Sequence, residues 1–330
     1  MPYLKDLARE LKQRLERTLH EHLPEAWLRT LIQGRGPRAA TVEVTTACNL
    51  RCPLCATHVH LRKRRFLTME LFEDILEGCG SRLRAVSLHI QGEPLVHREI
   101  FDFVRRCTDR GLYSGFSTNG VQLDSCTTEI FDSGLGFVSI AIDGCNAEDY
   151  SKYRHGGDFD RVVSATRKLM AEKRRRGATK PTVQVQAIMF PYNEDRGQEL
   201  VEFLEGLETD DVRLKSPSYC ASSDEIAAPR SAAAFLEEIG SDREGRHHAR
   251  SQQPDGALFR NRRLCPQLER ATVICDGRVV ACCMDSTGPT AYGDLNEESF
   301  GTIWRGEAHR RLLDDFFRGR LDLCRYCDAG

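Results

Sequence analysis

The 330-residue sequence contains no apolar run near the roughly 18–20 residues that a membrane-spanning helix needs. Its net charge is only −2, so it lacks the positive excess that is typical of nucleic-acid-binding proteins. Residues 1–23 carry charges throughout and show no apolar signal-peptide core. No internal repeat is found. These absences predict a cytoplasmic protein that acts on neither membrane nor nucleic acid.

Cysteine, by contrast, is abundant, with 14 residues. Because disulfides are rare in a reducing compartment, the spacing of these residues is more informative than their number. Six stand alone and are interpreted mainly as small buried side chains: Cys79, Cys107, Cys126, Cys145, Cys220 and Cys275. The other eight cluster along the chain: Cys48, Cys52 and Cys55, then Cys265, Cys282, Cys283, Cys324 and Cys327.

Strand and helix patterns alternate after residue 40. They follow an N-terminal segment of residues 1–39, in which the spacing of leucines from Leu4 to Leu19 predicts an amphipathic helix. Six such units in tandem predict an α/β fold with a parallel sheet and right-handed crossovers, as an open sheet or a partial barrel. The predicted strands are Ala40–Thr45, Ala85–Gln91, Tyr113–Ser117, Phe137–Ile142, Thr182–Phe190 and Asp211–Lys215. The predicted helices lie near 69–80, 98–110, 124–133, 158–176 and 194–206.

Polar residues recur at alternate positions of four predicted strands. Successive strand side chains point to opposite faces, and a sheet covered on both faces is normally apolar on both. One face is therefore predicted to line a wet cavity, which favours a barrel over an open sheet. The hydrogen-bonding residues expected there fit a polyhydroxylated substrate, and they are His89, Gln91, Gln184, Gln186 and Lys215.

The C-terminal third divides into two predicted parts. Residues 221–262 are rich in Ala, Ser and Arg and are interpreted as a segment that connects a barrel of residues 40–220 to a compact unit of residues 263–330. Within that unit, "ATVICDGRVVACCMD" predicts a β-hairpin that turns at Asp276–Gly277.

The first cysteine cluster, C-x3-C-x2-C, offers three thiols from one loop. Structural zinc takes four protein ligands, whereas three cysteines suit a cubic iron–sulfur cluster with one iron left open. The loop directly follows the first predicted strand, and active sites of parallel barrels lie at that carboxyl end.

Residues 40–220 resemble the radical S-adenosylmethionine (SAM) superfamily, whose signature is C-x3-C-x2-C after the first strand. The segments "QGEP", "STNG", "SIAIDG" and "YR" follow in the family's order, each near a predicted strand end. The resemblance implies a partial (β/α)6 barrel and a [4Fe–4S] cluster on Cys48, Cys52 and Cys55. Expected contacts to SAM come from Gly92, Glu93, Pro94, Ser117, Asn119, Ser139, Asp143, Arg154 and Gln186.

The sequence departs from the family at two positions. Leu54 stands where an aromatic residue usually precedes the third cysteine, so an apolar contact to adenine is expected without stacking. Gln91 replaces one of two glycines that often precede the glutamate, and its side chain is expected to reach the cavity.

The last cysteines resemble the small α+β auxiliary-cluster appendage called SPASM, in its shortened "twitch" form. The resemblance implies a second [4Fe–4S] cluster with four protein ligands, Cys265, Cys282, Cys324 and Cys327, although a four-cysteine zinc site is an alternative. Cys283 is expected to be a packed neighbour and Cys275 a strand residue without a metal.

A saturated cluster suits electron transfer, so the resemblance implies a dehydrogenase. The 5′-deoxyadenosyl radical from SAM would take hydrogen from a carbon that bears a hydroxyl, and the auxiliary cluster would accept an electron as the ketone forms. Related enzymes suggest a sugar, aminocyclitol or sugar nucleoside in antibiotic biosynthesis, with flavodoxin or ferredoxin as the electron donor. Lys215 is a candidate catalytic residue.

Three other reactions stay open. Decarboxylation of a sugar-nucleoside uronic acid would use Lys215 and the basic stretch Arg62–Arg65, with His58 and His60, to hold a carboxylate. Epimerisation would use Cys220 as a hydrogen donor. Modification of a ribosomal peptide is the third, and it usually needs a leader-binding domain that the residues before the barrel do not suggest.

Overall fold

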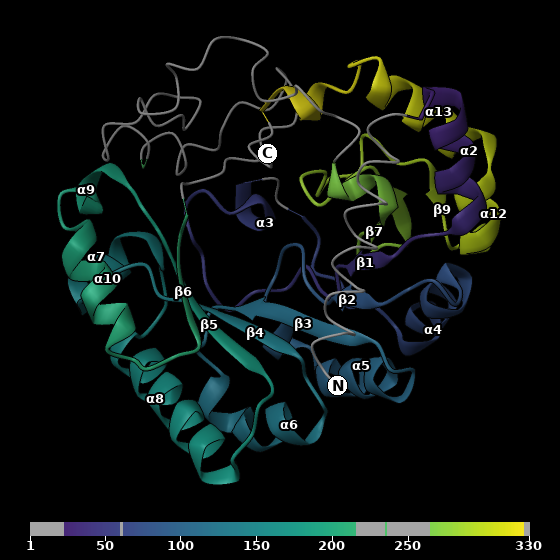
Figure 1. The fold of residues 1–330 in the computed structure, drawn as a ribbon. Helices are drawn as coiled ribbons and strands as arrows, with labels where there is room; N and C mark the ends of the chain where they lie inside the picture. Colours follow the sequence, from purple (N-terminus) through teal and green to yellow (C-terminus); the bar gives the residue numbers. More distant parts are fainter. Residues whose placement is uncertain (1–22, 60–61, 216–234, 236–264, 327–330) are drawn as a thin grey trace.

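The computed structural model describes residues 23–59, 62–215, 235 and 265–326. Six parallel strands lie side by side in the order of the sequence, and helices cover their outer face (Figure 1). The predicted α/β partial barrel is thus confirmed. The helix predicted within residues 4–19 lies outside the described residues. None of the described helices combines the length and the apolar character that a membrane span requires.

The barrel strands agree closely with the sequence prediction in position. They are β1 (Ala39–Val42), β2 (Ala85–Ser87), β3 (Tyr113–Thr118), β4 (Phe137–Ala141), β5 (Thr182–Ile188) and β6 (Asp211–Lys215). The crossover helices include α4 (Met69–Cys79), α5 (Ile100–Asp109), α6 (Thr127–Asp132), α7 (Ala147–Tyr153), α8 (Phe159–Arg176) and α10 (Gly197–Glu205). Short helices complete the barrel: α3 (Ala56–Val59), η1 (Pro94–Val96), η2 (Leu123–Cys126) and α9 (Pro191–Glu194).

Local sequence signals explain where several helices begin and end. Thr68 accepts a hydrogen bond from the backbone N–H of Leu71 and caps α4, and Asp158 caps α8 in the same way. Gly177 ends α8 in the left-handed conformation, with φ 59°, which glycine adopts without a steric penalty.

The C-terminal segment continues the barrel sheet. Strand β7 (Arg270–Val273) pairs in parallel with β1, and β8 (Arg278–Val280) and β9 (Gly293–Asp294) follow antiparallel. The sheet order is therefore β6-β5-β4-β3-β2-β1-β7-β8-β9. The predicted hairpin at Asp276–Gly277 is confirmed by the β7–β8 pair. The segment also contains η5 (Pro266–Glu269), α12 (Phe300–Arg305), α13 (Glu307–Phe317) and η6 (Asp322–Tyr326).

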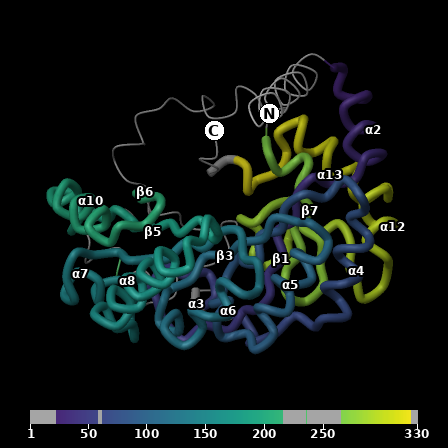
Figure 2. Tube along the Cα trace, turned by 60° about the horizontal axis from the view of Figure 1, so that its bottom comes forward, coloured from purple at the N-terminus to yellow at the C-terminus, as the bar shows by residue number. Residues whose placement is uncertain are grey.

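Helix α2 (Glu25–Arg35) packs on α12 and α13, far along the sequence, and both views place these helices side by side (Figures 1 and 2). The Trp304 indole N–H donates to the carbonyl of Ile32, and the Gln33 amide donates to the carbonyl of Gly306. Helix α2 and the C-terminal helices thus form one packed layer.

Strand β2 is shorter than predicted, because it ends at Ser87 rather than Gln91. Gly92 has φ 73°, and a Cβ there would lie 2.3 Å from the carbonyl oxygen of Thr45. Only glycine allows this left-handed turn so close to the cluster loop. His89 and Gln91 therefore lie in a loop beyond the strand.

His309 in α13 makes the C-terminal layer sensitive to acid. Its side chain is buried between the rings of Tyr292 and Trp304, its Nδ1 donates to the carbonyl of Trp304 at 2.6 Å, and burial lowers its pKa to about 4. The unfolded chain binds this proton from about pH 6.5 downward, so stability falls as the pH drops and about 2 kcal/mol is lost by pH 5. Urea unfolding of wild type and His309→Gln between pH 7.5 and 5 measures the difference. An equal pH dependence of the two proteins would contradict this role.

Candidate functional site

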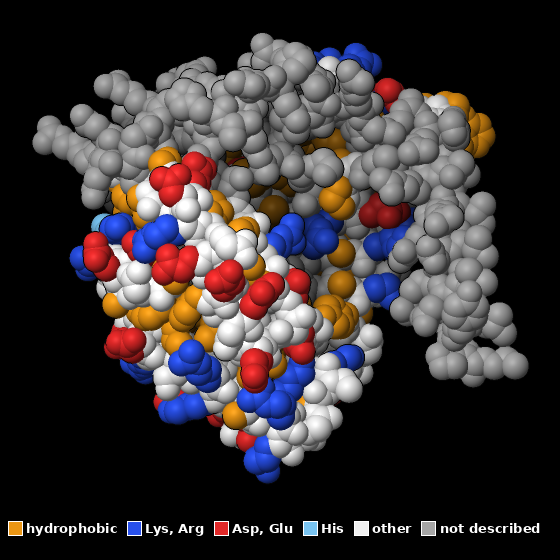
Figure 3. Space-filling view, turned by 60° about the vertical axis from the view of Figure 1, so that its left-hand side comes forward, with side chains coloured by type: hydrophobic (Ala, Val, Ile, Leu, Met, Phe, Trp, Pro, Cys, Tyr) orange, Lys and Arg blue, Asp and Glu red, His pale blue; other side chains and the backbone are white. Residues whose placement is uncertain are grey.

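A cavity of about 280 Å³ lies at the carboxyl ends of the barrel strands. Seen from the side of α7, α8 and α10, the surface carries interspersed charges of both signs and is hollowed beside a group of Lys and Arg side chains (Figure 3). The cavity is lined by Cys48, Leu50, Cys52, Leu54, Cys55, Ala56, His89, Ile90, Gln91, Gly92, Glu93, Ser117, Thr118, Asn119, Ala141, Tyr153, Arg154, Gln186, Ile188 and Lys215.

The three clustered cysteines all line this cavity. Burial raises the pKa of Cys48 to about 11 and that of Cys52 to about 12, so both are thiols at neutral pH unless a cation stabilises the thiolate. Their loop packs on a small aromatic cluster in which the rings of Tyr153 and Phe190 lie 4.7 Å apart. Leu54 belongs to the same cluster, so this loop is held by apolar contacts.

The donor set fits an iron–sulfur cluster. Three thiols from one loop face one cavity, and thiolates are the usual ligands of such clusters. Among the described residues, no three Cys, His, Asp or Glu side chains lie close enough together to hold a single metal ion. A cubic cluster does not require that, because each thiolate binds a different iron atom.

Glu93 is fixed at the floor of the cavity. Its carboxylate accepts hydrogen bonds from the Thr118 hydroxyl and the Asn119 N–H, both at 2.7 Å, and from the Leu95 N–H at 3.0 Å. The side chain of Asn119 in turn donates to Asn49 at 2.8 Å, one residue after Cys48. Burial raises the pKa of Glu93. The "QGEP" and "STNG" segments thus meet, because they follow the neighbouring parallel strands β2 and β3.

Arg154 is held over the cysteine loop by Asp143. The Nε of Arg154 donates to Asp143, whose other oxygen accepts from the Ile188 N–H at 2.7 Å, and Arg154 Nη1 lies 3.9 Å from Cys52 Sγ. Burial opposes the charge of Arg154, but the adjacent Asp143 raises its pKa overall. Asp143 is itself fully buried and does not line the cavity, so it acts by orienting the guanidinium.

His89 presents a hydrogen-bond donor to the cavity. Its Nδ1 lies 3.2 Å from the Ser117 N–H, which donates to it, so the neutral ring carries its proton on Nε2. Burial, together with the positive charge of Lys215, lowers the pKa of His89 to about 4. Burial and the nearby Arg213 also lower the pKa of Lys215.

Two glutamines complete the polar lining. The Oε1 of Gln186 is buried and has no hydrogen-bond partner within the described part of the chain. Gln91 lines the cavity as expected, with its Oε1 3.7 Å from Cys55 Sγ. Unmatched buried acceptors are costly, so Gln186 is suited to a ligand that donates a hydrogen bond.

Several predicted residues do not line the cavity. Ser139 donates to Gln184 at 3.0 Å, and Gln184 turns toward Asp211, so this pair fills the barrel below the site. Pro94 is buried at the start of η1. Arg62 is paired with Glu43 and, like Lys63, Arg64 and Arg65, lies away from the lining. The basic stretch is therefore not part of this lining. His60 and Cys220 lie outside the described residues, and so does the side chain of His58.

Other lining residues were missed by the sequence prediction. Thr118 supports Glu93, and Leu50 and Ile188 supply apolar wall. The period-two pattern of β3 and β5 could have identified Thr118 and Ile188 as strand-end positions, but it did not distinguish apolar residues that face a cavity from those of the core.

The auxiliary cysteines lie on separate elements of the C-terminal segment. Cys265 directly precedes η5, Cys282 is buried two residues after β8, and Cys324 lies within η6. Cys327 lies outside the described residues. The buried carboxylate of Asp285 accepts from the N–H groups of Gly288 and Thr290, both at 2.7 Å, and so shapes the loop after Cys282.

Comparison with known families decides what this arrangement is. Residues 42–204 match the radical SAM superfamily model, and residues 265–328 match the model of an iron–sulfur cluster-binding domain, SPASM. The chain is a radical SAM protein with a SPASM domain. These two domains imply [4Fe–4S] clusters and SAM as cofactors.

Relatives of this radical SAM protein differ in what their names describe. It is 28% identical over 140 residues to the probable GTP 3′,8-cyclase of Methanocaldococcus jannaschii. This match covers 42% of this chain and 47% of that protein. It is 33% identical over 135 residues to the mycofactocin maturase MftC of Mycolicibacterium smegmatis. This match covers 40% of this chain and 34% of MftC. The chain thus spans about half, or less, of these relatives' length.

Among solved structures, SuiB of Streptococcus suis bound to its precursor peptide SuiA has a similar fold. The TM-score is 0.63 at 14% sequence identity, and the match covers 92% of this chain and 74% of SuiB. At this identity the similarity establishes the fold of the radical SAM protein and not its substrate.

Proposed function

We propose that this radical SAM protein oxidises a secondary alcohol of a small polyhydroxylated molecule, such as a sugar, an aminocyclitol or a sugar nucleoside, to a ketone. The bound cofactors would supply a radical that removes hydrogen from carbon and, at the SPASM domain, an acceptor for one electron. The chain's own residues would bind the substrate and take up the hydroxyl proton.

The observation that carries this proposal is the polar wall formed by His89, Gln186 and Lys215 in the cavity that also contains the three cysteines. His89 offers an N–H donor, and Gln186 offers a buried acceptor that has no partner among the described residues. A hydroxyl group both donates and accepts, so it matches the two at once. An apolar side chain would leave both polar groups unpaired, at a cost of roughly 1–3 kcal/mol each.

Two groups have the chemistry to hold the methionine end of SAM. The Glu93 carboxylate has about four acceptor positions and uses three for Thr118, Asn119 and Leu95, which leaves capacity for an ammonium group. Arg154 keeps unused N–H donors beyond its contact with Asp143 and suits a carboxylate. We propose these roles for Glu93 and Arg154, and an apolar contact with adenine for Leu54.

Lys215 is the proposed proton acceptor for the substrate hydroxyl, because it lines the cavity beside His89 and Gln186 and because burial lowers the pKa of its amine. Lys215→Met is expected to reduce ketone formation about 10²-fold, within the range for general base catalysis, and to leave substrate-free cleavage of SAM unchanged. Lys168→Met, which removes an exposed lysine of α8, serves as the matched control. Equal ketone formation by both variants would contradict the role of Lys215.

A product screen tests the reaction itself. The anaerobic, reduced protein is incubated with SAM and a panel of sugars, aminocyclitols and nucleosides, and products are examined by mass spectrometry. Oxidation yields a product lighter by two hydrogens with one SAM consumed per turnover. Loss of carbon dioxide would instead indicate decarboxylation, and uptake of one solvent deuterium without another mass change would indicate epimerisation.

Peptide modification is the second candidate, favoured by the similarity to the maturase MftC. The same protein, incubated with a panel of synthetic peptides, would then show a mass change on a peptide and none on the small molecules. That outcome would replace the alcohol-oxidation proposal.

A further inference from the structure

Glu43 is a charged residue in a buried segment, where apolar residues are usual. It directly follows β1 in "TVEV", and its side chain is fully buried. A buried carboxylate is costly unless several donors compensate its charge. None of the roles proposed above uses Glu43, so the contacts that keep it there indicate a separate function.

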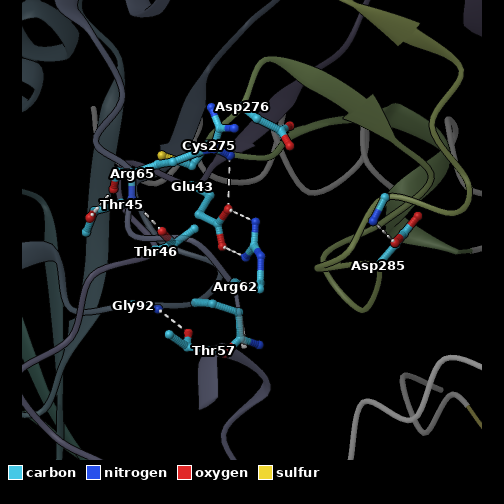
Figure 4. Close-up of polar contacts among 12 residues, drawn as sticks. Glu43, Thr45, Thr46, Thr57, Arg62, Arg65, Gly92, Cys275, Asp276 and Asp285 are labelled. Carbon is cyan, nitrogen blue, oxygen red and sulfur yellow. Dashed lines mark hydrogen bonds and ion pairs between the residues drawn. The ribbon is translucent and has the colours of Figure 1, made fainter. Parts of the chain in front are cut away.

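Three donors converge on the Glu43 carboxylate (Figure 4). Arg62 binds both oxygens through its two terminal nitrogens, at 2.5 and 2.8 Å, and the backbone N–H of Cys275 donates at 2.9 Å. The Arg62 side chain is only 10% exposed. Such a fork-shaped pair fixes both partners in orientation as well as in distance.

Arg62 belongs to the returning limb of the loop that carries Cys48, Cys52 and Cys55. At the base of this loop the hydroxyl of Thr45 donates to the carbonyl of Arg65, and the hydroxyl of Thr46 donates to that of Lys63, both at 2.7 Å. Glu43 therefore joins the outgoing and returning limbs of the cluster loop at their common base.

Cys275 belongs to the SPASM domain. It lies between β7 and β8, its Sγ is 3.8 Å from the carbonyl oxygen of Val44, and the strand that follows leads within two residues to Cys282. Glu43 also donates its own N–H to the carbonyl of Val273 at 2.9 Å. One residue thus contacts the segments that carry the ligands of both clusters.

We propose that Glu43 is a positioning residue that couples the two cluster sites. By holding Arg62 on one side and the β7–β8 turn on the other, it transmits the arrangement of the SPASM hairpin to the loop that binds the first cluster. The residue does not touch the cavity, so its effect is on where the three thiols lie and not on the chemistry.

Glu43→Gln tests this coupling, because it keeps the shape and one acceptor but removes the charge and the bidentate pair. Glu269→Gln is a matched control. Glu269 also joins the C-terminal segment to the barrel, through Arg82 at 2.5 Å, but at the opposite end of the β1–β7 pair, where its carbonyl accepts from Arg38. The full chain is reconstituted anaerobically for each variant.

The first readout is amide hydrogen exchange of residues 46–59, and the second is the SAM concentration that half-converts the electron paramagnetic resonance signal of the reduced protein. Glu43→Gln is expected to speed the exchange and to raise that concentration on the order of 10- to 100-fold, as losses of supporting groups around metal sites do. Glu269→Gln is expected to change neither. If both variants behave alike in the two readouts, the proposal is wrong.

Two further variants keep the proposal testable if Glu43→Gln fails to fold. Arg62→Lys keeps the charge but loses the fork, so it should loosen residues 46–59 in the same direction. Cys324→Ala removes a ligand of the SPASM site. In an otherwise wild-type chain it should also speed the amide exchange of residues 46–59, whereas in an Arg62→Lys chain it should change that exchange little further. Wild-type exchange in Arg62→Lys, or fully additive effects in the double variant, would overturn the coupling. These readouts need no substrate and are independent of the proposed oxidation.

Discussion

Cys52→Ala is expected to abolish the reductive cleavage of SAM. Cys52 is one of three thiols on the cavity wall, and its side chain is only 6% exposed, so no water or neighbouring side chain can readily replace it as a ligand. The rate of SAM cleavage should fall by more than about 10²-fold, which is the upper end of the range for removing a group that only supports a metal ligand. The measurements are iron content after anaerobic reconstitution and release of 5′-deoxyadenosine under dithionite.

Cys107→Ala is the matched control for this experiment. Cys107 is a fully buried cysteine of α5 in the main hydrophobic core, away from the cavity. Its replacement should lower thermal stability through the lost packing but leave iron content and SAM cleavage intact. A Cys52→Ala protein that retains full SAM cleavage would show that this loop does not hold the cluster.

Arg154→Met should have the second-largest effect, on both stability and SAM binding. The substitution leaves Asp143, which is fully buried, without its cationic partner. Removing one member of a buried ion pair typically destabilises a protein by about 3–5 kcal/mol. It also removes the guanidinium proposed to bind the SAM carboxylate. Denaturant unfolding and SAM titration measure the two effects separately.

The double variant Arg154→Met/Asp143→Asn separates structure from binding. The asparagine keeps an acceptor for the Ile188 N–H but carries no charge, so most of the lost stability should return. SAM binding should remain weak, because the guanidinium is still absent. Recovery of SAM binding in the double variant would show that Arg154 only balances the charge of Asp143.

Much of the barrel could be predicted from the sequence because period-two alternation and helix caps are local signals. All six barrel strands begin within one residue of their predicted starts, and the hairpin at Asp276–Gly277 follows from its turn residues. The prediction is wrong at the end of β2, which stops at Ser87 rather than Gln91. Beyond it the chain turns at Gly92 beneath the carbonyl of Thr45, a contact that the pattern of β2 alone does not reveal.

The candidate site was predicted less completely, because its shape depends on pairs distant in sequence. Asp143, an expected SAM contact, is buried and pairs with Arg154, and Ser139 turns to Gln184 rather than to the cavity. Arg62 was considered for an anionic ligand, whereas its partner is Glu43. The lone acidic residue in "TVEV" was the available signal, since an isolated charge at the end of a buried strand requires a partner.

Cys48, Cys52 and Cys55 are expected to hold a cluster at which SAM can bind. The most direct measurement is electron paramagnetic resonance of the reduced, anaerobically reconstituted protein before and after SAM is added, together with assay of 5′-deoxyadenosine. The structure predicts a new signal on SAM addition, release of 5′-deoxyadenosine, and loss of both in Cys52→Ala. An unchanged signal and no 5′-deoxyadenosine from a protein with a full complement of iron would contradict it.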